Sequence, residues 1–315
     1  MSFKKSDRDV GVSIDPAGQP SIGVLSDGKP GHLNQSLGLA DALQRLRPNL
    51  HIQQIPALTR RQAMAEMLWP KRRSENMRLL IAAGHGTHLS LLALRRAYRC
   101  PGIVLMRPSL PGSLFDVRIE PRHDGGRDSD RCWISDGPLN RMQPSLDQSN
   151  QSDAGLILIG GPSPHFTWDE AALTEQLKVL CDGRRPWVLS GSRRTPASFL
   201  AALEALQLPG LGIHPAATLP PGWLAAQLPR CSQCWVSPDS ASMVYEALTA
   251  GCAVGVFDLP AVAGSRVAGA LEGLKARQLL ISFEDFAKGA APTVAATPFA
   301  EADRFAQRIL DRGWL

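Results

Sequence analysis

Short apolar runs alternate with longer amphipathic stretches along most of this chain. In the first half, the runs of strand length lie at 22–25, 79–83, 103–106 and 115–119. Between them, stretches that repeat apolar residues at helical spacing lie near 33–46, 60–69 and 87–98. Because parallel strands need a crossover connection that is usually a helix, this alternation predicts a parallel sheet covered by helices.

The second half repeats this rhythm without repeating the letters. Its strand-length runs lie at 155–161, 186–191, 233–237 and 253–257, and its helical stretches lie near 169–181, 196–206 and 240–250. A last helix is expected at about 298–313, packed back on the first half. The segment 143–153, QPSLDQSNQSD, is polar, rich in turn residues and not periodic, which is typical of a linker.

We therefore predict an α/β protein made of two doubly wound, Rossmann-like domains that face each other across a cleft. Residues 21–150 are expected to form the first domain, residues 151–315 the second, and residues 1–20 a flexible leader. Two domains of this length are of ordinary size.

Composition is that of a soluble globular enzyme, with 44% hydrophobic and 20% charged residues. No apolar run reaches membrane-spanning length, and the polar start lacks the apolar core of a secretory signal. Six scattered cysteines favour reduced thiols and a cytoplasmic location. Only Cys231 and Cys234 form a C-x-x-C pair, which is either a zinc or redox site or a pair of semi-buried thiols.

Charge is distributed unevenly between the halves. Residues 1–150 carry a net charge of +7 and residues 151–315 a net charge of −2, which together make the +5 of the chain. A basic first half suits anionic lipid headgroups, a phosphorylated acceptor or nucleic acid. Because no interleaved aromatic residues or nucleic-acid-binding module is present, we do not expect nucleic acid as a partner.

One basic stretch, 59–73 (TRRQAMAEMLWPKRR), also carries apolar residues at helical spacing. The apolar residues are Met64, Met67, Leu68 and Trp69, and the flanking basic residues are Arg60, Arg61, Lys71, Arg72 and Arg73. This pattern is typical of a helix that lies on a membrane surface. The alternative is a core-facing helix with a solvated basic rim.

Candidate chemistry gathers where predicted strands end. Small or reactive residues follow five strands, at 26–32 (SDGKPGH), 84–88 (GHGTH), 160–165 (GGPSPH), 190–196 (SGSRRTP) and 237–243 (SPDSASM). Ligands of doubly wound sheets bind beyond the carboxyl ends of the strands, so we expect these loops to line one cleft.

Several common motifs are missing from these loops. The sequence contains no G-x-G-x-x-G after the first strand, no P-loop and no G-x-S-x-G elbow, which argues against a dehydrogenase, a P-loop enzyme and a serine hydrolase. His85 and His88 have no H-E-x-x-H pattern or nearby carboxylate, so we expect no metal there.

The loops at 190–196 and 237–243 suit a phosphorylated ligand. Asp239, Ser240 or Ser242 is expected to cap the following helix, whose N-terminus favours phosphate, with Glu246 one turn inside. The alternative is a capping box followed by a surface glutamate. Arg193 and Arg194 present guanidinium groups that fit a diphosphate, or else they belong to a solvated turn.

Two stretches resemble GT-B glycosyltransferases of the type that forms lipid II. GKPGHLNQSLGLADAL resembles their N-terminal glycine-rich loop and helix, and SASMVYEALTAGCAVGVFDLP resembles their donor-site helix. Together with IGGPSPHFTW and SGSRRTP, these stretches identify the chain, from about residue 20 onward, as similar to the mitochondrial-fission Elm-type family. The resemblance implies a GT-B-like fold.

The resemblance also implies roles for individual residues. Glu246 matches the glutamate that binds the donor ribose, Ser240 to Met243 match the helix start that meets the diphosphate, and His32 matches a loop histidine proposed as base or phosphate contact. The full donor set is Gly160, Gly161, Ser163, Ser192, Arg193, Arg194, Thr195, Asp239, Ser240, Ser242, Met243 and Glu246. The acceptor or phosphate loops comprise Gly28, Lys29, Gly31, Asn34, Gln35, Gly84, His85, Gly86 and Thr87.

The function implied is transfer of a sugar from a nucleotide-diphosphate donor to an envelope-type or lipid-linked acceptor. His32 is the expected base, with Asp27 as the second choice. No metal or other cofactor is expected, and the protein is expected in the cytoplasm, peripheral at the inner face of a membrane. The alternatives are a non-hydrolysing nucleotide-sugar epimerase and a non-catalytic GT-B-like scaffold. Segment 261–274 lacks the glutamine pair by which the lipid II enzyme recognises its sugar, so the sugar is left open.

Overall fold

The structure is a computed structural model that describes residues 18–71, 73, 76–145, 153–297 and 299–315. Most of the expected leader, most of the expected linker and Arg72 lie outside the described residues. The remaining residues form two six-stranded sheets, each of them parallel throughout, which confirms the predicted α/β class.

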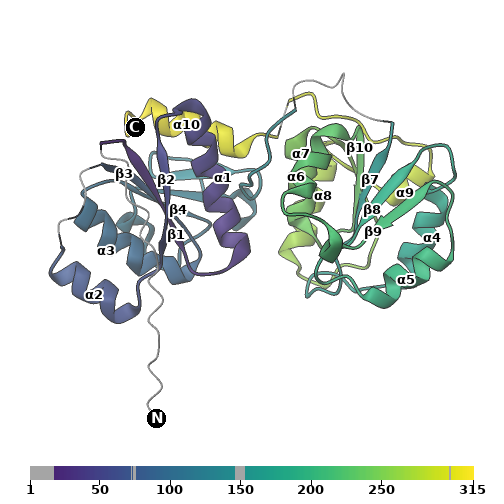
Figure 1. The fold of residues 1–315 in the computed structure, drawn as a ribbon, viewed down its shortest axis with the longest axis horizontal. Helices are drawn as coiled ribbons and strands as arrows, with labels where there is room; N and C mark the ends of the chain where they lie inside the picture. Colours follow the sequence, from purple (N-terminus) through teal and green to yellow (C-terminus); the bar gives the residue numbers. More distant parts are fainter. Residues whose placement is uncertain (1–17, 72, 74–75, 146–152, 298) are drawn as a thin grey trace, which may run out of the picture.

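The first sheet has the strand order β2-β1-β3-β4-β5-β6 (Figure 1). Its strands are β1 Ser21–Ser26, β2 His51–Pro56, β3 Met77–Ala83, β4 Gly102–Leu105, β5 Val117–Pro121 and β6 Cys132–Ser135. The helices of this half are α1 Pro30–Leu46, α2 Arg60–Leu68 and α3 His88–Tyr98. Figure 1 shows α1 on the side of this sheet that faces the second half, and α2 on the outer side of α3.

The second sheet has the order β12-β11-β10-β7-β8-β9. Its strands are β7 Gly155–Leu158, β8 Trp187–Ser190, β9 Leu211–His214, β10 Gln233–Val236, β11 Ala253–Val256 and β12 Ile281–Ser282. The helices that follow β7 are α4 Glu170–Leu180, α5 Ala197–Ala205, α6 Trp223–Gln227, α7 Ala241–Ala250, α8 Arg266–Ala276, α9 Phe283–Ala287 and α10 Glu301–Asp311.

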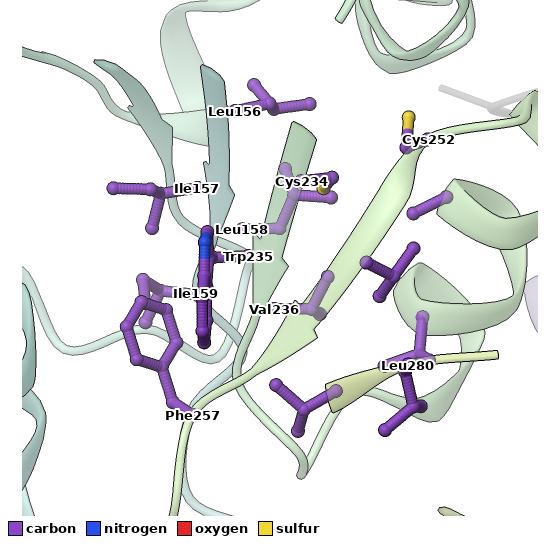
Figure 2. Close-up of a cluster of buried hydrophobic side chains, with 14 of the residues drawn as sticks. Leu156, Ile157, Leu158, Ile159, Cys234, Trp235, Val236, Cys252, Phe257 and Leu280 are labelled. Atoms are coloured by element: carbon purple, nitrogen blue, oxygen red, sulfur yellow. The ribbon is translucent and has the colours of Figure 1, made fainter. Parts of the chain in front are cut away.

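Continuous apolar runs occupy the centre of the second sheet. Ile157 in β7 and Trp235 in β10 are fully buried, and Figure 2 shows Leu156 to Ile159 beside Trp235 and Phe257. Central strands of a parallel sheet are covered on both faces, which explains why these strands are apolar at nearly every position. Each fully buried Leu or Ile side chain contributes about 1.5–3 kcal/mol to stability.

The last helix, α10, packs on the first half although it follows the second in sequence. Phe305 and Ile309 of α10 are fully buried in the same core as Ile22 and Trp133. The rings of Phe305 and Trp133 stack with centroids 6.0 Å apart. In Figure 1 the chain returns from the second half to reach this position. Two crossings of the chain therefore connect the halves.

Residues 136–140, which follow β6, contact α7 and Arg277 of the second half. Asn140 Nδ2 donates to Thr249 Oγ1 at 3.0 Å, and both side chains are buried. Gly137 lies against Tyr245 so closely that a Cβ on it would come within 2.2 Å of the ring. Asp136 adds an ion pair across the halves with Arg277, at 3.0 Å. These contacts set how far the two halves stand apart.

Candidate functional site

A cleft of about 940 Å³ lies between the two halves. Asn34 and Asp41 of α1 form one wall, and Arg141 to Gln143 also line the cleft. The opposite wall comes from the second half and consists of Leu158, Ser190, Gly191, Ser192, Arg193, Arg194, Ser240, Ser242, Met243 and Glu246, with the segment 216–225 beside them. The loops at the ends of β7, β8 and β10 thus meet at one edge of the second sheet, as parallel strands require.

The Asp239 carboxylate accepts hydrogen bonds from residues of all three loops at this edge. Its Oδ1 accepts a hydrogen bond from Ser237 Oγ at 2.7 Å, and its Oδ2 accepts from the Gly161 N–H at 2.8 Å and from Arg194 at 2.9 Å. Gly160 has to be a glycine, because a Cβ there would come within 2.0 Å of the Asp239 carboxylate. The buried aspartate therefore ties the loop after β7 to the loop after β10.

Asp239 does not cap α7, and neither serine does. The N-cap residue is Ser240, and its side chain makes no capping hydrogen bond. The expected cap was therefore wrong, and so was the alternative of a capping box, because Asp239 is engaged with Gly161, Ser237 and Arg194 instead. In the first turn of α7 the Met243 N–H donates to the Ser240 oxygen at 3.0 Å, whereas among the described residues the N–H groups of Ala241 and Ser242 have no backbone partner and are available to an anion at the cleft, which Ser240 and Ser242 line.

The two arginines after β8 have different environments. Arg194 donates to the backbone oxygens of Gly161 at 3.1 Å and Pro162 at 3.0 Å in addition to Asp239. Arg193 is exposed, lines the cleft and, within the described part of the chain, makes no hydrogen bond or ion pair. Arg194 is thus a structural link between loops, whereas the guanidinium of Arg193 is free to bind a ligand.

Small hydroxyl side chains hold the same loop in place. Thr195 Oγ1 accepts from the Ser192 N–H at 2.6 Å and donates to the Ile159 oxygen at 2.9 Å. Ser192 Oγ donates to the Gly160 oxygen at 2.7 Å. On the loop after β7, Ser163 Oγ accepts from the His165 N–H at 3.2 Å. These hydrogen bonds fix the shape of the cleft edge.

Glu246 lines the cleft one turn into α7, where α1 comes close to it. Asn34 Nδ2 of α1 donates to Glu246 Oε1 at 3.4 Å, which links the two halves across the cleft. Burial raises the pKa of Glu246 to about 7, and the hydrogen bond from Asn34 only partly opposes that shift. The half-buried Glu246 carboxylate accepts only the long hydrogen bond from Asn34 among the described residues. It can therefore accept further hydrogen bonds from a ligand.

An Asp–His pair stands at the start of α1. His32 Nδ1 lies 2.9 Å from Asp27 Oδ2, and the two side chains are 22% and 10% exposed. Burial raises the pKa of Asp27, but hydrogen bonds from His32 and the Lys29 N–H outweigh this effect and hold it below its usual value. Because an ionised carboxylate only accepts, Nδ1 is the nitrogen that donates to Asp27, and in the neutral imidazole this tautomer leaves the lone pair on Nε2.

The loop after β3 supports this pair. Gly84 has φ 85°, and a Cβ there would come within 2.1 Å of His32 Nδ1, so both its conformation and the close approach require glycine. A Cβ on Gly86 would lie 3.0 Å from Asp27 Cβ. Thr87 is buried and closes the loop by donating to the Gly84 oxygen at 2.7 Å. Loops 26–32 and 84–88 therefore meet each other. Of the five loops predicted to line one cleft, however, only those at 190–196 and 237–243 contribute residues to the cleft described above, and no residue of 26–32, 84–88 or 160–165 lines it.

The other residues predicted for the first half have mainly local contacts. Gly28 has φ 81° in the turn between Asp27 and Lys29, and Gly31 is in the first turn of α1. Gln35 Nε2 lies 3.8 Å from Met106 Sδ. The rings of His85 and His88 meet edge to face, 5.5 Å apart. Burial and the neighbouring His85 lower the pKa of His88.

No described group of three or more His, Cys, Asp or Glu side chains is arranged to hold a metal ion. All six cysteines are buried and free. Burial raises the pKa of Cys231 and, more strongly, that of Cys234. Of the two interpretations of the C-x-x-C pair, the geometry favours buried thiols, which are unreactive because the thiolate is the reactive form.

The family described as Mitochondrial fission ELM1 matches residues 30–313. The chain belongs to this family. The matched region begins at Pro30, so it includes His32 and α1 but not Asp27 or the preceding strand. No curated protein matches the sequence of this ELM1-family member.

Solved structures resemble this family member in fold. A structure from Listeria monocytogenes described as a "putative UDP-N-acetylglucosamine 2-epimerase" superposes with a TM-score of 0.50 at 14% identity, over 93% of this chain and 95% of its own. MurG from Acinetobacter baumannii gives 0.49 at 14% identity, over 94% and 92%. MnaA from S. aureus, solved with UDP, gives 0.47 at 14% identity, over 94% and 98%. Such low identity shows the fold alone, and that fold is the predicted GT-B-like one.

The sequence-based prediction missed part of the cleft of this ELM1-family protein. The segment 216–225 contributes Leu219, Pro220 and the half-buried Trp223, and α1 contributes Asp41, which pairs with Arg141 at 2.7 Å. The one available signal was the turn sequence PPGW, in which a tryptophan follows two prolines and a glycine. The sequence PPGW does not indicate whether Trp223 faces the cleft. The position of this segment depends on the edge strand β9 before it, which the sequence did not predict.

Proposed function

We propose that this ELM1-family protein is a glycosyltransferase that takes a sugar from a nucleotide-diphosphate donor. One observation carries the proposal: Glu246, Arg193 and the start of α7 line the same cleft, and α1, whose first turn contains His32, forms its opposite wall. A carboxylate for hydroxyls and cations for phosphate in one cleft fit a nucleotide sugar.

The donor would lie along the second half. The diphosphate would bind between Arg193 and the first turn of α7, where a guanidinium and free N–H groups supply positive charge, and we propose that no metal is needed. The ribose hydroxyls would donate to Glu246. The nucleobase would rest on the apolar wall made by Leu219, Pro220 and Trp223.

His32 and Asp27 would supply the base. As the acceptor oxygen attacks the anomeric carbon, His32 Nε2 takes the hydroxyl proton, and the bond from that carbon to the diphosphate breaks to release the nucleoside diphosphate. Asp27 holds the ring and stabilises the imidazolium that forms. Asp27 is therefore proposed as a positioning residue, not as the base that the sequence left as second choice.

We propose a lipid-linked or other envelope-type acceptor held by the first half, because that half carries the excess of positive charge. Such an acceptor places the reaction at the cytoplasmic surface of a membrane, with the enzyme associated peripherally. None of the described helices is long and apolar enough to cross a bilayer.

The direct test has two stages. A thermal-shift panel of nucleoside diphosphates identifies the base, because a ligand of the native state raises the melting temperature by mass action. The matching nucleotide sugars are then incubated with lipid-extract acceptors, and the products are separated. Sugar on the acceptor supports a transferase, an epimeric nucleotide sugar without acceptor supports an epimerase, and no nucleotide binding at all leaves a scaffold.

Replacing Arg193 and Arg194 separately distinguishes ligand binding from stability. Arg193→Ala is expected to weaken nucleoside-diphosphate binding by roughly tens-fold and to leave nucleoside binding almost unchanged, since one charge-assisted bond to phosphate is lost.

Arg194→Ala is expected to lower the free energy of unfolding by about 1–3 kcal/mol, since buried Asp239 loses its cation. Calorimetric titration and chemical denaturation measure these effects, with the exposed Arg184→Ala as control. Equal losses for nucleoside and nucleoside diphosphate with Arg193→Ala would contradict the assignment.

Trp223 provides a test of the nucleobase position. Trp223→Ala is expected to weaken nucleoside-diphosphate binding by roughly tenfold, because base–aromatic stacking is worth about 1–3 kcal/mol. Binding of inorganic pyrophosphate should stay unchanged, and Trp223→Phe should keep most of the affinity. If pyrophosphate binding falls in parallel, the tryptophan only shapes the cleft.

A further inference from the structure

Three large apolar side chains at the end of α2 are exposed. Met64 is 51% exposed, Leu68 64% and Trp69 75%, the highest value among the large exposed hydrophobic side chains of the described residues. Eight such side chains are exposed in the described part of the chain, and these three lie within six positions of one another. Met64 and Leu68 are one helical turn apart and therefore share a face. The sequence-based alternative of a core-facing helix does not hold for these positions.

The backbone that carries these side chains is well anchored. Thr59 and Gln62 form a capping box at the start of α2, and the Trp69 N–H donates to the Ala65 oxygen at 2.9 Å. Buried Glu66 accepts from the Lys71 N–H at 2.9 Å and from Arg73 at 3.2 Å, which fixes the chain after the helix. The apolar side chains are thus held outward on an ordered scaffold.

The charges around them are positive. Arg60, Arg61 and Lys71 are exposed, and among the described residues none of their side chains pairs with a carboxylate. The segment 59–73 contains one acidic residue, Glu66, and that residue is buried and paired with Arg73. We call Met64, Leu68 and Trp69, with Arg60, Arg61 and Lys71, the α2 face.

We propose that the α2 face docks on a membrane surface that contains anionic lipid. Trp69, Leu68 and Met64 would enter the interface between headgroups and acyl chains, and the basic residues would meet lipid phosphates. Each Lys or Arg held near an anionic surface increases partitioning by about fivefold. The positive charges of the α2 face and its exposed tryptophan fit an anionic bilayer better than they fit an uncharged groove on a protein.

The position of α2 leaves the cleft accessible in the docked state. Figure 1 shows α2 on the outer side of α3, whereas α1 stands between the first sheet and the second half. Docking through α2 therefore covers neither Glu246 nor Arg193. The inference deepens the proposed function by naming the membrane partner, and it rests on that function only for the nature of the acceptor.

The test is co-sedimentation of the full chain with vesicles of phosphatidylcholine alone and of phosphatidylcholine with phosphatidylglycerol. We expect binding to the anionic vesicles that weakens with salt and little binding to the neutral ones. The double variant Leu68→Ser/Trp69→Ser and the variant Arg60→Glu/Arg61→Glu should each lower the bound fraction at least roughly tenfold. Val179→Ser and Lys178→Glu, at exposed positions of α4 in the other half, are the matched controls and should bind like the parent.

The proposal would be overturned if the parent did not bind anionic vesicles, or if the α2 variants bound them as well as the parent does. It would also be overturned if light scattering showed that the α2 variants lose self-association while they keep vesicle binding. The last result would assign the face to a second copy of the chain. Nucleoside-diphosphate thermal shifts on the same variants show that they are folded. They also separate the two proposals, since vesicle binding can persist in a protein that binds no nucleotide.

Discussion

His32→Ala is expected to lower sugar transfer by on the order of a hundredfold or more and to leave nucleotide affinity nearly unchanged. The imidazole lies in the first turn of α1, the helix whose Asn34 and Asp41 line the cleft opposite Arg193 and the start of α7. Its loss therefore removes the proposed proton acceptor without touching the donor site. Turnover is measured under saturating nucleotide sugar, and affinity by calorimetric titration of the nucleoside diphosphate.

Asp27 separates a positioning role from a direct one. Asp27→Asn keeps the shape but can donate to the ring, which favours the wrong tautomer, so we expect a loss of roughly tenfold to a hundredfold with unchanged nucleotide affinity. His214→Ala, at an exposed position of β9, is the control. Transfer by His32→Ala at the parental rate would remove the proposed base. A rate loss in Asp27→Asn that exceeds that of His32→Ala would make the aspartate the base.

Glu246→Ala is expected to abolish measurable nucleoside-diphosphate binding. Two ribose hydroxyls donating to a half-buried carboxylate contribute roughly 3 kcal/mol, which corresponds to about a hundredfold in affinity. Glu246→Gln keeps the size of the side chain and should lose most of this effect, since an amide accepts more weakly than a carboxylate. Asn34→Ala is the companion variant, because it removes the cross-cleft hydrogen bond but no proposed donor contact. Nucleotide binding by Glu246→Ala at parental strength would exclude the proposed ribose site.

The raised pKa of Glu246 predicts how pH affects binding and stability. Since its pKa in the empty cleft is about 7 and the ribose binds the ionised form, nucleotide affinity should rise as pH increases through 7 and level off above it. Stability should change in the opposite direction, because the folded state favours the proton. The contribution of Glu246 is complete below the ordinary glutamate pKa of 4.5 and is lost as pH rises through about 7. Glu246→Gln should remove both dependences, which titration and denaturation at several pH values can check.

The sequence predicted the interior of each sheet and missed the edges. β1, β3, β4 and β5 were expected, as were β7, β8, β10 and β11, because central strands are buried on both faces and therefore apolar along their length. The four strands that went unpredicted, β2, β6, β9 and β12, are the four edge strands. β2 reads HIQQIP and is half exposed, and β12 has only two residues. An edge strand that is covered on fewer sides has a weak pattern, as β2 and β9 do. β6 is buried at all four positions, so this reason does not apply to it.

The same limit applies to the cleft. Sequence alone indicated which loops follow the central strands and carry the candidate site residues, because burial is encoded in local patterns and parallel strands end at one edge. It also identified the family through local motifs such as SDGKPGH and SPDSASM.

Only the tertiary structure decided what each side chain does there. Arg193 and Arg194 are adjacent in sequence, yet one is free in the cleft and the other is held by Asp239, 45 positions away. Asn34 meets Glu246 across 212 positions, and Trp223 joins the same cleft after an edge strand that the sequence does not reveal. Hydrogen bonding, burial and the resulting pKa depend on distances between residues that are remote along the chain, and no local pattern contains those distances.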